Sequence, residues 1–334
     1  MTLKSVFLAS AAAAVALPAA ADVNIYTTRQ PELIQPVMDA FTAETGIAVN
    51  LAYVQDGIVE RLQAEGARSP ADLVMTVDIA NLQKIVDGGV IQAVDSDVLA
   101  ASVPAELRSD ENLWFALTTR ARIVYASKDR VADGEITTYE DLASDAWEGR
   151  ICTRSGVHNY NLALVSALIE HHGVEYTRQW AADVRENLAR KPEGNDRAQV
   201  RAIWAGECDI SLGNTYYMGQ MLADPEQTEW ANSVRIVFPT FEGEGTHINV
   251  SGVAMTKAAP NHDEALQLME FLVSPEAQAI YAEANNEYPV LEGAALSDLV
   301  ASWGTFEHDK IDLTEVAGHR ATALRIMEEV NFDG

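Results

Sequence analysis

Residues 22–54 read DVNIYTTRQPELIQPVMDAFTAETGIAVNLAYV, and this stretch decides the fold. Short apolar segments stand at both of its ends, as expected for two strands. Between them, at 32–45, apolar residues recur at helical spacing, namely Leu33, Ile34, Val37, Met38 and Phe41. Gly46 follows this run directly, and glycine is the residue that most often ends a helix. A strand, a helix and a second strand in succession predict a βαβ unit with parallel strands.

The same alternation continues along the chain. A helix is expected at 57–67, a strand at 72–77 and another helix at 79–87. TTRARIVYAS at 118–127 reads as an extended strand that crosses to a second lobe, and THINVSGVAMT at 246–256 reads as the return crossing. We therefore predict an α/β protein of two lobes with a hinge of two crossing strands. Ligands in such folds bind beyond strand ends, in the cleft between the lobes.

The crossings suggest boundaries for the two lobes. We expect the N-terminal lobe to comprise residues 22–120 plus 243–294, and the C-terminal lobe residues 121–242 plus 295–334. Three groups of polar residues fall where strands are expected to end. They are 27–31, Asp78 and 214–217, and they are the first candidates for a ligand site.

The first 21 residues, MTLKSVFLASAAAAVALPAAA, have the pattern of a cleaved secretory signal peptide. Lys4 supplies positive charge, residues 6–17 are apolar, and the small residues Ala19, Ala20 and Ala21 precede the expected cleavage. The apolar stretch is too short to span a bilayer. We expect export to the periplasm without direct membrane insertion.

The net charge limits the partners that the protein can bind, and the cysteine content indicates how its two cysteines are used. The formal net charge of −27 argues against nucleic acid and anionic lipid as partners. The only two cysteines are Cys152 and Cys208, and an isolated pair in an oxidising compartment predicts one disulfide bond. A cysteine-containing metal site is the alternative, but the chain has no CxxC motif and no histidine pair nearby at ligand spacing.

Motifs for common enzyme chemistries are absent from the sequence. It contains no GxSxG, no Walker loop, no GxGxxG and no HExxH. We therefore expect a protein that is not an enzyme. A secreted hydrolase that uses carboxylates with His158 or His247 remains the alternative from a different functional class.

Tyr216 and Tyr217 stand side by side between a strand expected at 208–212 and a helix-like run. Phenolate oxygen is a hard anionic donor, and hard trivalent iron prefers such ligands. The alternative is ordinary packing, with one ring in the core and one on the surface. The pair alone does not decide between these readings.

Longer segments carry a resemblance to a known family. NIYTTRQPELIQPVMDAFTAETGI at 24–47, GRICTRSGVHNYNLALVSALI at 149–169 and RAIWAGECDISLGNTYYMGQM at 201–221 resemble segments of the ferric-iron-binding periplasmic proteins, the bacterial transferrins of the Fbp and Fut type. The resemblance extends over nearly all of the chain after residue 21. Its most specific part is NTYY at 214–217 combined with NYN at 159–161.

The resemblance implies a type II periplasmic binding fold that holds Fe(III) in its cleft. It also implies delivery of the iron to an ABC permease in the inner membrane, and we expect the protein to be a monomer. Tyr160, Tyr216 and Tyr217 match the ligand tyrosines of the family. A carrier of the same fold for a polyamine, thiamine or an oxyanion is the alternative.

The sequence departs from some relatives after the first strand. Where those relatives carry His-Tyr, this chain has Gln30 and Pro31, which are poor iron ligands. The resemblance then implies the branch that uses three tyrosines and a small anion such as carbonate. Arg29 would hold this anion by a forked contact, and the amide of Gln30 would donate to it.

Three further residues are candidates for the surroundings of the ligands. Arg120 and Arg122 are both expected near the phenolates, where a positive charge would lower phenol pKa values, and the sequence does not separate them. Asp78 either bonds a cleft arginine or caps the helix at 79–87, and the cap is the favoured reading.

Overall fold

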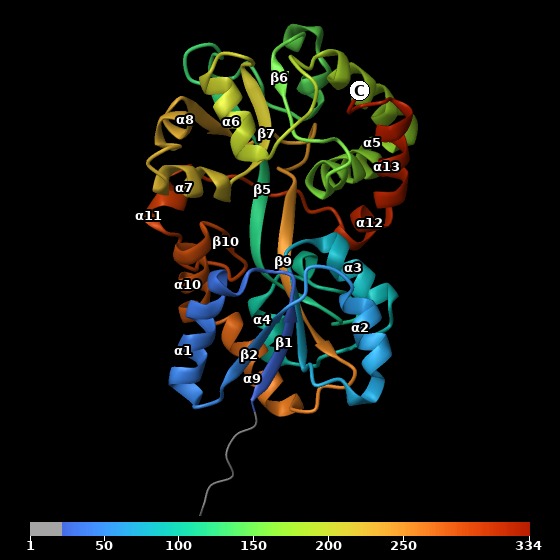
Figure 1. The fold of residues 1–334 in the computed structure, drawn as a ribbon, viewed down its shortest axis with the longest axis vertical. Helices are drawn as coiled ribbons and strands as arrows, with labels where there is room; N and C mark the ends of the chain where they lie inside the picture. Colours follow the sequence, from blue (N-terminus) through green and yellow to red (C-terminus); the bar gives the residue numbers. More distant parts are fainter. Residues whose placement is uncertain (1–21) are drawn as a thin grey trace, which may run out of the picture.

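The computed structural model describes residues 22–334, which form two lobes arranged along the long axis of the molecule (Figure 1). The predicted signal peptide at 1–21 lies outside the described residues. No helix within residues 22–334 combines the length and the apolar character that a membrane crossing requires.

The secondary structure is a mixture of strands and helices. The strands are β1 (Val23–Thr27), β2 (Val49–Tyr53), β3 (Leu73–Thr76), β4 (Ile91–Gln92), β5 (Phe115–Ser127), β6 (Ile151–Cys152), β7 (Ile210–Asn214), β8 (Val234–Val237), β9 (Ile248–Thr256) and β10 (Tyr288–Pro289). The helices are α1 (Gln35–Thr45), α2 (Ile58–Glu65), α3 (Ile79–Asp87), α4 (Asp97–Ser102), α5 (Asn159–Glu186), α6 (Asp196–Trp204), α7 (Tyr216–Ala223), α8 (Thr228–Asn232), α9 (His262–Leu272), α10 (Pro275–Asn285), α11 (Asp298–Ser302), α12 (Leu313–Gly318) and α13 (Arg320–Glu329).

The βαβ unit expected from residues 22–54 is confirmed. β1 pairs in parallel with β2 and with β3, with Val23 opposite Val49 and Ile25 opposite Leu73. Gly46 ends α1 with φ of 76°, a left-handed conformation that glycine adopts without a steric penalty. Helices α1, α9 and α10 lie on one side of this N-terminal lobe, and α2 and α3 lie on the other (Figure 1).

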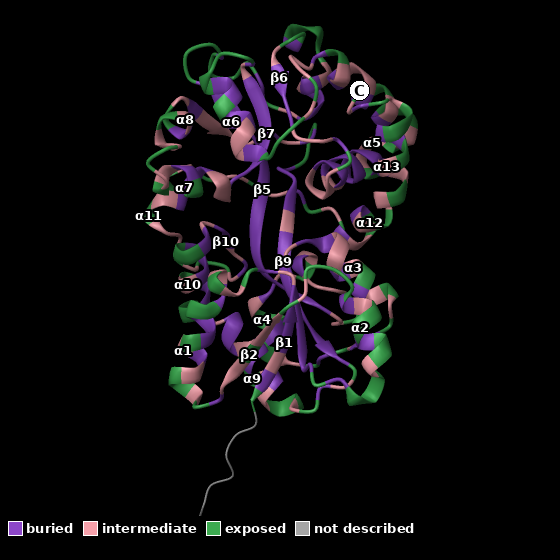
Figure 2. Cartoon of the chain, viewed as in Figure 1, coloured by how far each residue is buried: buried purple, intermediate pink, exposed green. Residues whose placement is uncertain are grey.

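The two crossing strands are also confirmed, and they are β5 and β9. The first half of β5 pairs with β9, from Phe115 to Ala121, and its second half pairs with β7 and β8 from Arg122 onward. A single strand therefore belongs to the sheets of both lobes. Both crossing strands are buried over most of their length, as Figure 2 shows. This arrangement makes β5 and β9 the hinge.

Each lobe has its own hydrophobic core. One apolar cluster surrounds β1, β3 and β9, and two further clusters fill the lobe that carries α5 and β7. Helix α12 connects the cores, because Leu313 packs in the first and Val316 in the second. The lobe boundaries suggested by the sequence stay a prediction at the level of single residues.

The predicted disulfide is present in the C-terminal lobe. Cys152 ends β6, Cys208 precedes β7, and the two sulfur atoms are bonded. Because β6 and β7 are parallel neighbours, the bond fastens the strand that leads directly into the paired tyrosines.

Candidate metal centre

The three candidate tyrosines come together on the C-terminal lobe. Tyr160 is the second residue of α5, and Tyr216 and Tyr217 are the first two residues of α7. The hydroxyl of Tyr216 donates to the phenol oxygen of Tyr160 at 3.1 Å, across 56 residues of sequence. The ring centroids of Tyr216 and Tyr217 are 4.4 Å apart. All three side chains are half-buried and line one cleft of about 440 Å³.

His158 fixes the start of the helix that carries Tyr160. Its Nδ1 accepts a hydrogen bond from the backbone N–H of Tyr160 at 3.2 Å, and the two rings lie 4.6 Å apart. Burial, followed by the charge of Arg154, lowers the pKa of His158 to about 4. The imidazole is therefore neutral at neutral pH, which leaves Nδ1 free to accept this bond as a helix cap must.

Tyr125 fixes the junction that presents the tyrosine pair. Its hydroxyl donates to the carbonyl oxygen of Asn214 at 2.7 Å, at the end of β7. Its ring also covers the Cα of Gly213, where an added Cβ would lie 2.2 Å from the Tyr125 ring. Glycine at 213 is thus required by this close approach, and the strand end is held directly behind the tyrosines.

A buried layer of charge lies behind the phenols. Asp196, at the start of α6, is fully buried and accepts from Arg122 at 2.8 Å and from Arg154 at 3.1 Å. Both guanidinium groups lie over the ring of Tyr160, at 5.8 Å and 5.1 Å from its centroid. Two arginines on one buried carboxylate hold a net positive charge next to the tyrosines.

The structure separates Arg120 from Arg122. Arg120 lines the cleft and donates to the hydroxyl of Ser251 at 2.9 Å, whereas Arg122 does not line the cleft and pairs with Asp196 beneath the tyrosines. The separation arises because β5 changes its partner from β9 to β7 between these two residues. Of the two, Arg120 is the residue in contact with the cleft.

The facing wall belongs to the N-terminal lobe. Thr28, Arg29, Gln30 and Tyr53 line it. Arg29 follows β1 and donates through Nη2 to Glu287 at 2.7 Å and to Ser251 at 2.7 Å. Arg29 and Arg120 therefore meet on one serine hydroxyl, and Arg29 already has a carboxylate partner.

Asp78 caps α3. One of its carboxylate oxygens accepts from the backbone N–H of Asn81 at 2.8 Å, and the other accepts from the Asn81 side chain at 2.9 Å. The favoured reading of this residue as a helix cap thus agrees with its contacts. Its neighbour Val77, and not Asp78 itself, is among the residues that line the cleft.

The surroundings of Tyr216 and Tyr217 favour the neutral phenols over the phenolates. Burial, followed by the proximity of Tyr160 and Tyr217, raises the pKa of Tyr216 well above its ordinary value of 10.0, although Arg120 partly opposes this. Burial and Tyr160 likewise raise the pKa of Tyr217. Ionisation of these groups near neutral pH therefore requires a strong Lewis acid that replaces the protons.

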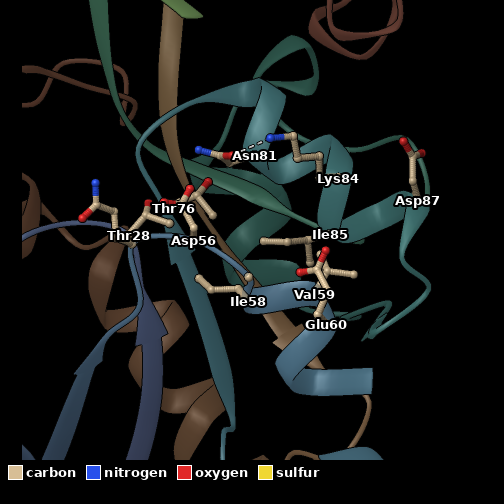
Figure 3. A pocket seen from close by; sticks show the side chains of 12 residues that line it. Thr28, Asp56, Ile58, Val59, Glu60, Thr76, Asn81, Lys84, Ile85 and Asp87 are labelled. Atoms are coloured by element: carbon tan, nitrogen blue, oxygen red, sulfur yellow. Dashed lines mark hydrogen bonds between the residues drawn. The ribbon is translucent and has the colours of Figure 1, made fainter. Parts of the chain in front are cut away.

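A second hollow lies within the N-terminal lobe alone. It has a volume of about 320 Å³ and is lined by the strand-end residue Thr28 and by polar residues of α2, α3 and the loop before α2, including Asp56, Glu60, Lys84 and Asp87 (Figure 3). Lys84 points toward Asn81, at 3.5 Å. No tyrosine lines this hollow, so the phenolic site is confined to the interlobe cleft.

Other metal-binding side chains do not cluster in the described part of the chain. Within residues 22–334, no three or more His, Cys, Asp or Glu side chains are grouped so that they could hold a metal ion. His158 and His247, the histidines of the hydrolase alternative, do not line the cleft. The convergence of phenols is thus the feature of residues 22–334 with the donor chemistry for a hard cation.

Several neighbours of the site were not identified from the sequence. Glu287, Ser251 and Asp196 form its polar framework, and Arg197 lines the cleft beside the tyrosines. Asp196 and Arg197 are adjacent at a helix start, which is an ordinary place for an acidic residue and a weak signal. Glu287 follows α10 in a loop, and nothing in the local sequence indicates its partners.

Comparisons with known proteins agree over most of the chain. Residues 37–308 match the family model described as bacterial extracellular solute-binding protein. "Iron uptake protein A1" of Synechocystis sp. is 44% identical over 314 residues, which are 93% of this chain and 87% of that protein.

Solved structures share the same fold. Mannheimia haemolytica ferric iron-binding protein A, in an open conformation, superposes with a TM-score of 0.90 at 46% identity and covers 94% of this chain and all of its own. The Trichodesmium protein described as IdiA or FutA, in complex with iron and citrate, gives a TM-score of 0.89 at 41% identity, over 93% of this chain and 99% of its own.

Proposed function

This chain belongs to the bacterial extracellular solute-binding protein family, and from that premise we propose that it captures Fe(III) between its lobes through phenolates of Tyr160, Tyr216 and Tyr217. The expected two-lobed fold and the resemblance to ferric iron-binding periplasmic proteins are confirmed. The family consists of solute-binding proteins, which fits the expectation that this one is not an enzyme.

One observation carries the proposal. Phenol oxygens from α5 and α7 lie 3.1 Å apart, although 56 residues separate them in the sequence. Two like charges can share such a place only if a cation joins them, since two phenolates at this distance repel each other strongly. Support comes from the iron-related names of the relatives with 44% and 46% identity.

Charge and coordination call for an anion beside the iron. Three phenolates cancel the charge of Fe(III), but six-coordination leaves positions unfilled. We infer that carbonate or a similar anion occupies them, held from the N-terminal lobe by Arg29 and Gln30, with Arg120 close by. The iron and citrate ligands of the Trichodesmium relative support the presence of an anion.

Capture would proceed by closure of the lobes about β5 and β9. The tyrosines lie on one lobe and the anion-binding residues mainly on the other, so that iron with its anion binds the closed state more tightly than the open one. In this proposal the protein acts in the periplasm as a monomer and delivers iron to an inner-membrane ABC permease. The lobes would follow the boundaries 22–120 plus 243–294 and 121–242 plus 295–334.

The visible spectrum of the purified protein tests the proposal. Addition of ferric iron with bicarbonate is expected to produce an orange-red charge-transfer band, because phenolate donates electron density to Fe(III). The triple variant with phenylalanine at 160, 216 and 217 should lack this band. Tyr176→Phe is the control, since Tyr176 is 43% exposed and does not line the cleft. A triple variant that kept both colour and affinity would rule out these ligands.

A further inference from the structure

The segment that leads to Tyr160 is not part of a sheet. Residues 153–158 connect the end of β6 to the start of α5, and no helix or strand includes them. The tyrosine pair, in contrast, closely follows β7, and Tyr125 holds the end of that strand. The position of Tyr160 relative to Tyr216 therefore depends on the contacts that hold this connecting segment.

The residues after α13 fold back toward the connecting segment. Asn331 has φ of 50°, and its backbone N–H donates to the carbonyl oxygen of Glu328 at 3.0 Å. The N–H of Phe332 donates to the carbonyl oxygen of Met327 at 3.0 Å. These two bonds form a Schellman motif, in which a residue of left-handed conformation ends the helix, and asparagine adopts this conformation more readily than most residues. Because α13 lies beside α5 (Figure 1), the motif turns the chain toward the start of α5.

Phe332 and Met327 close over a glycine of the connecting segment. A Cβ added at Gly156 would lie 2.5 Å from Cδ1 of Phe332 and 2.6 Å from Cε of Met327. Both of these side chains are buried and belong to the core of the C-terminal lobe. Glycine at 156 is therefore required by a close approach. The connecting segment and the end of α13 are packed against each other without space for a side chain between them.

Asp333 adds two hydrogen bonds to this contact. Its Oδ1 accepts from the backbone N–H of Gly156 at 2.7 Å, and its Oδ2 accepts from the hydroxyl of Ser155. Hydrogen bonds to an ionised carboxylate are stronger than those between neutral groups. Two consecutive residues of the connecting segment are thus held by one side chain that is 177 residues away from Gly156 in the sequence.

Both neighbours of Tyr160 are tied to this arrangement. The carbonyl oxygen of Ser155 accepts from the side-chain amide of Asn161 at 3.1 Å. Arg320, the first residue of α13, donates through Nη2 to Oδ1 of Asn159 at 2.8 Å. The residue before Tyr160 is therefore held by α13 directly, and the residue after it is held through Ser155.

We propose that Asp333 is a positioning residue, which places the phenol oxygen of Tyr160 where it can share a cation with Tyr216. Asp333 does not line the cleft, so it acts through Ser155 and Gly156 and not on the cation itself. The ligands of a metal site have to be held to within about 0.5 Å, and the residues that support them provide this precision. The inference rests on the proposed iron-binding function and deepens it, because it identifies what sets the spacing of the ligands.

The test measures iron binding in two backgrounds. Asp333→Ala is made in the wild type and in Tyr160→Phe, and each protein is titrated with ferric iron in bicarbonate while the charge-transfer band reports binding. Loss of a residue that supports a metal ligand typically lowers affinity ten- to hundredfold, so we expect Asp333→Ala to weaken binding about tenfold in the wild type. In Tyr160→Phe the same change should have almost no further effect, because the ligand that Asp333 positions is already absent.

Glu329→Ala is the matched control. Glu329 is the last residue of the same helix, but its side chain is 46% exposed and pairs with Arg178 at the surface. This variant should bind iron as wild type does. Asp333→Asn keeps one acceptor oxygen and should therefore lose less affinity than Asp333→Ala. It replaces the alanine variant in the titrations if denaturation curves show that the latter is poorly folded.

Two outcomes would overturn the inference. Unchanged affinity in Asp333→Ala would mean that the spacing of the tyrosines does not depend on this carboxylate. Equal weakening in both backgrounds would mean that Asp333 supports the C-terminal lobe in general and does not act through Tyr160.

Hydrogen exchange in the iron-free protein separates this inference from the iron-binding proposal. The amides of residues 155–161 are expected to exchange faster in Asp333→Ala, whereas those of residues 210–218 should exchange as in wild type. A wild type without a charge-transfer band would refute the iron-binding proposal, and the exchange rates would still decide whether Asp333 holds the segment. A normal band in wild type with unchanged exchange in Asp333→Ala would refute the role of Asp333 alone.

Discussion

The side-chain amide of Asn286 lies directly against the Cα of Gly219. A Cβ added at Gly219 would lie 2.4 Å from Cγ of Asn286, which is closer than any unstrained contact. Asn286 follows α10 in the N-terminal lobe and has φ of 53°, and Gly219 is in the first turn of α7 after Tyr216. In Figure 1, α7 and α10 accordingly lie on the same side of the molecule, one in each lobe, where the lobes meet. The helix that carries two of the tyrosines therefore touches the opposite lobe at a glycine.

This contact predicts that Gly219→Ala weakens iron binding without destabilising the protein. Alanine favours a helix over glycine by about 1 kcal/mol, so α7 itself should become more stable. The added methyl group, however, displaces the amide of Asn286 and separates the lobes locally. We expect a several-fold loss of iron affinity, measured by titration of the charge-transfer band, with an unchanged or higher melting temperature.

A second substitution checks the cause. Asn286→Gly removes the amide and tolerates the positive φ, because glycine adopts this conformation readily. The double variant Gly219→Ala, Asn286→Gly should regain most of the lost affinity. If the single variant binds iron as wild type does, the contact has no part in the placement of α7.

Asp196 is expected to be the most sensitive position for stability near the site. Its carboxylate is fully buried and accepts from Arg122 and Arg154, so Asp196→Asn leaves the buried Arg122 and the half-buried Arg154 without a charged partner. Removal of one member of such a network costs about 3–5 kcal/mol. Chemical denaturation should show this loss, whereas Asp263→Asn, at a side chain that is 99% exposed, should change little.

Glu287 should make stability depend on pH in the acid range. Burial alone would raise the pKa of Glu287, but the charges of Arg29 and Arg120 outweigh it and lower the pKa below the ordinary 4.5. A carboxylate with a lowered pKa stabilises the folded state above the ordinary value, and this contribution disappears as pH falls through the lowered value. Glu287→Gln should therefore be clearly less stable than wild type at pH 7.

The difference between the two proteins should shrink at low pH. Below the ordinary value of 4.5, wild type increasingly carries a protonated Glu287 and approaches the variant in charge. Free energies of unfolding from denaturant titrations at pH 7, 5 and 3 would measure this trend. A difference that stays constant over this range would show that the contribution of Glu287 is not one of charge.

The disulfide bond should contribute to the stability of the folded protein but not to its binding of iron. It closes a loop of 56 residues, which in the chain-entropy model corresponds to about 4 kcal/mol. The double variant Cys152→Ser, Cys208→Ser should unfold at a lower denaturant concentration. At 25 °C it should still bind iron with the same colour, because Tyr125 continues to hold the end of β7. Loss of the band in a protein that is still folded would contradict this.

The sequence predicted the elements that depend on local pattern. The apolar spacing before Gly46 and the helix Ile79–Asp87 follow from periodicity and from terminal signals, and both are found in the structure. The residues around Arg120 indicated an extended strand, and this is the crossing strand β5. The three tyrosines came from a motif shared with a family, and the structure places their rings together.

Contacts between distant residues could not be predicted in this way. Spacing alone puts Arg120 and Arg122 on one side of a strand, and they differ only because the strand changes partners between them. Glu287 accepts a hydrogen bond from Arg29, which is 258 residues away in the sequence, and Asn286 of one lobe lies against Gly219 of the other. Such pairs depend on the position of one lobe relative to the other, which no local pattern contains.

The placement of β9 has a consequence for the biogenesis of the protein. β9 is inserted between β3 and β5, with Val74 opposite Ala254, so the first lobe lacks a central strand until three quarters of the polypeptide has been made. Until then β3 presents an unpaired edge, and the nascent N-terminal half cannot complete a stable sheet. Pairing over such long stretches of chain also slows folding. The N-terminal lobe is therefore expected to complete its sheet only late in synthesis, and an unfolded chain is the state that the export predicted from residues 1–21 requires.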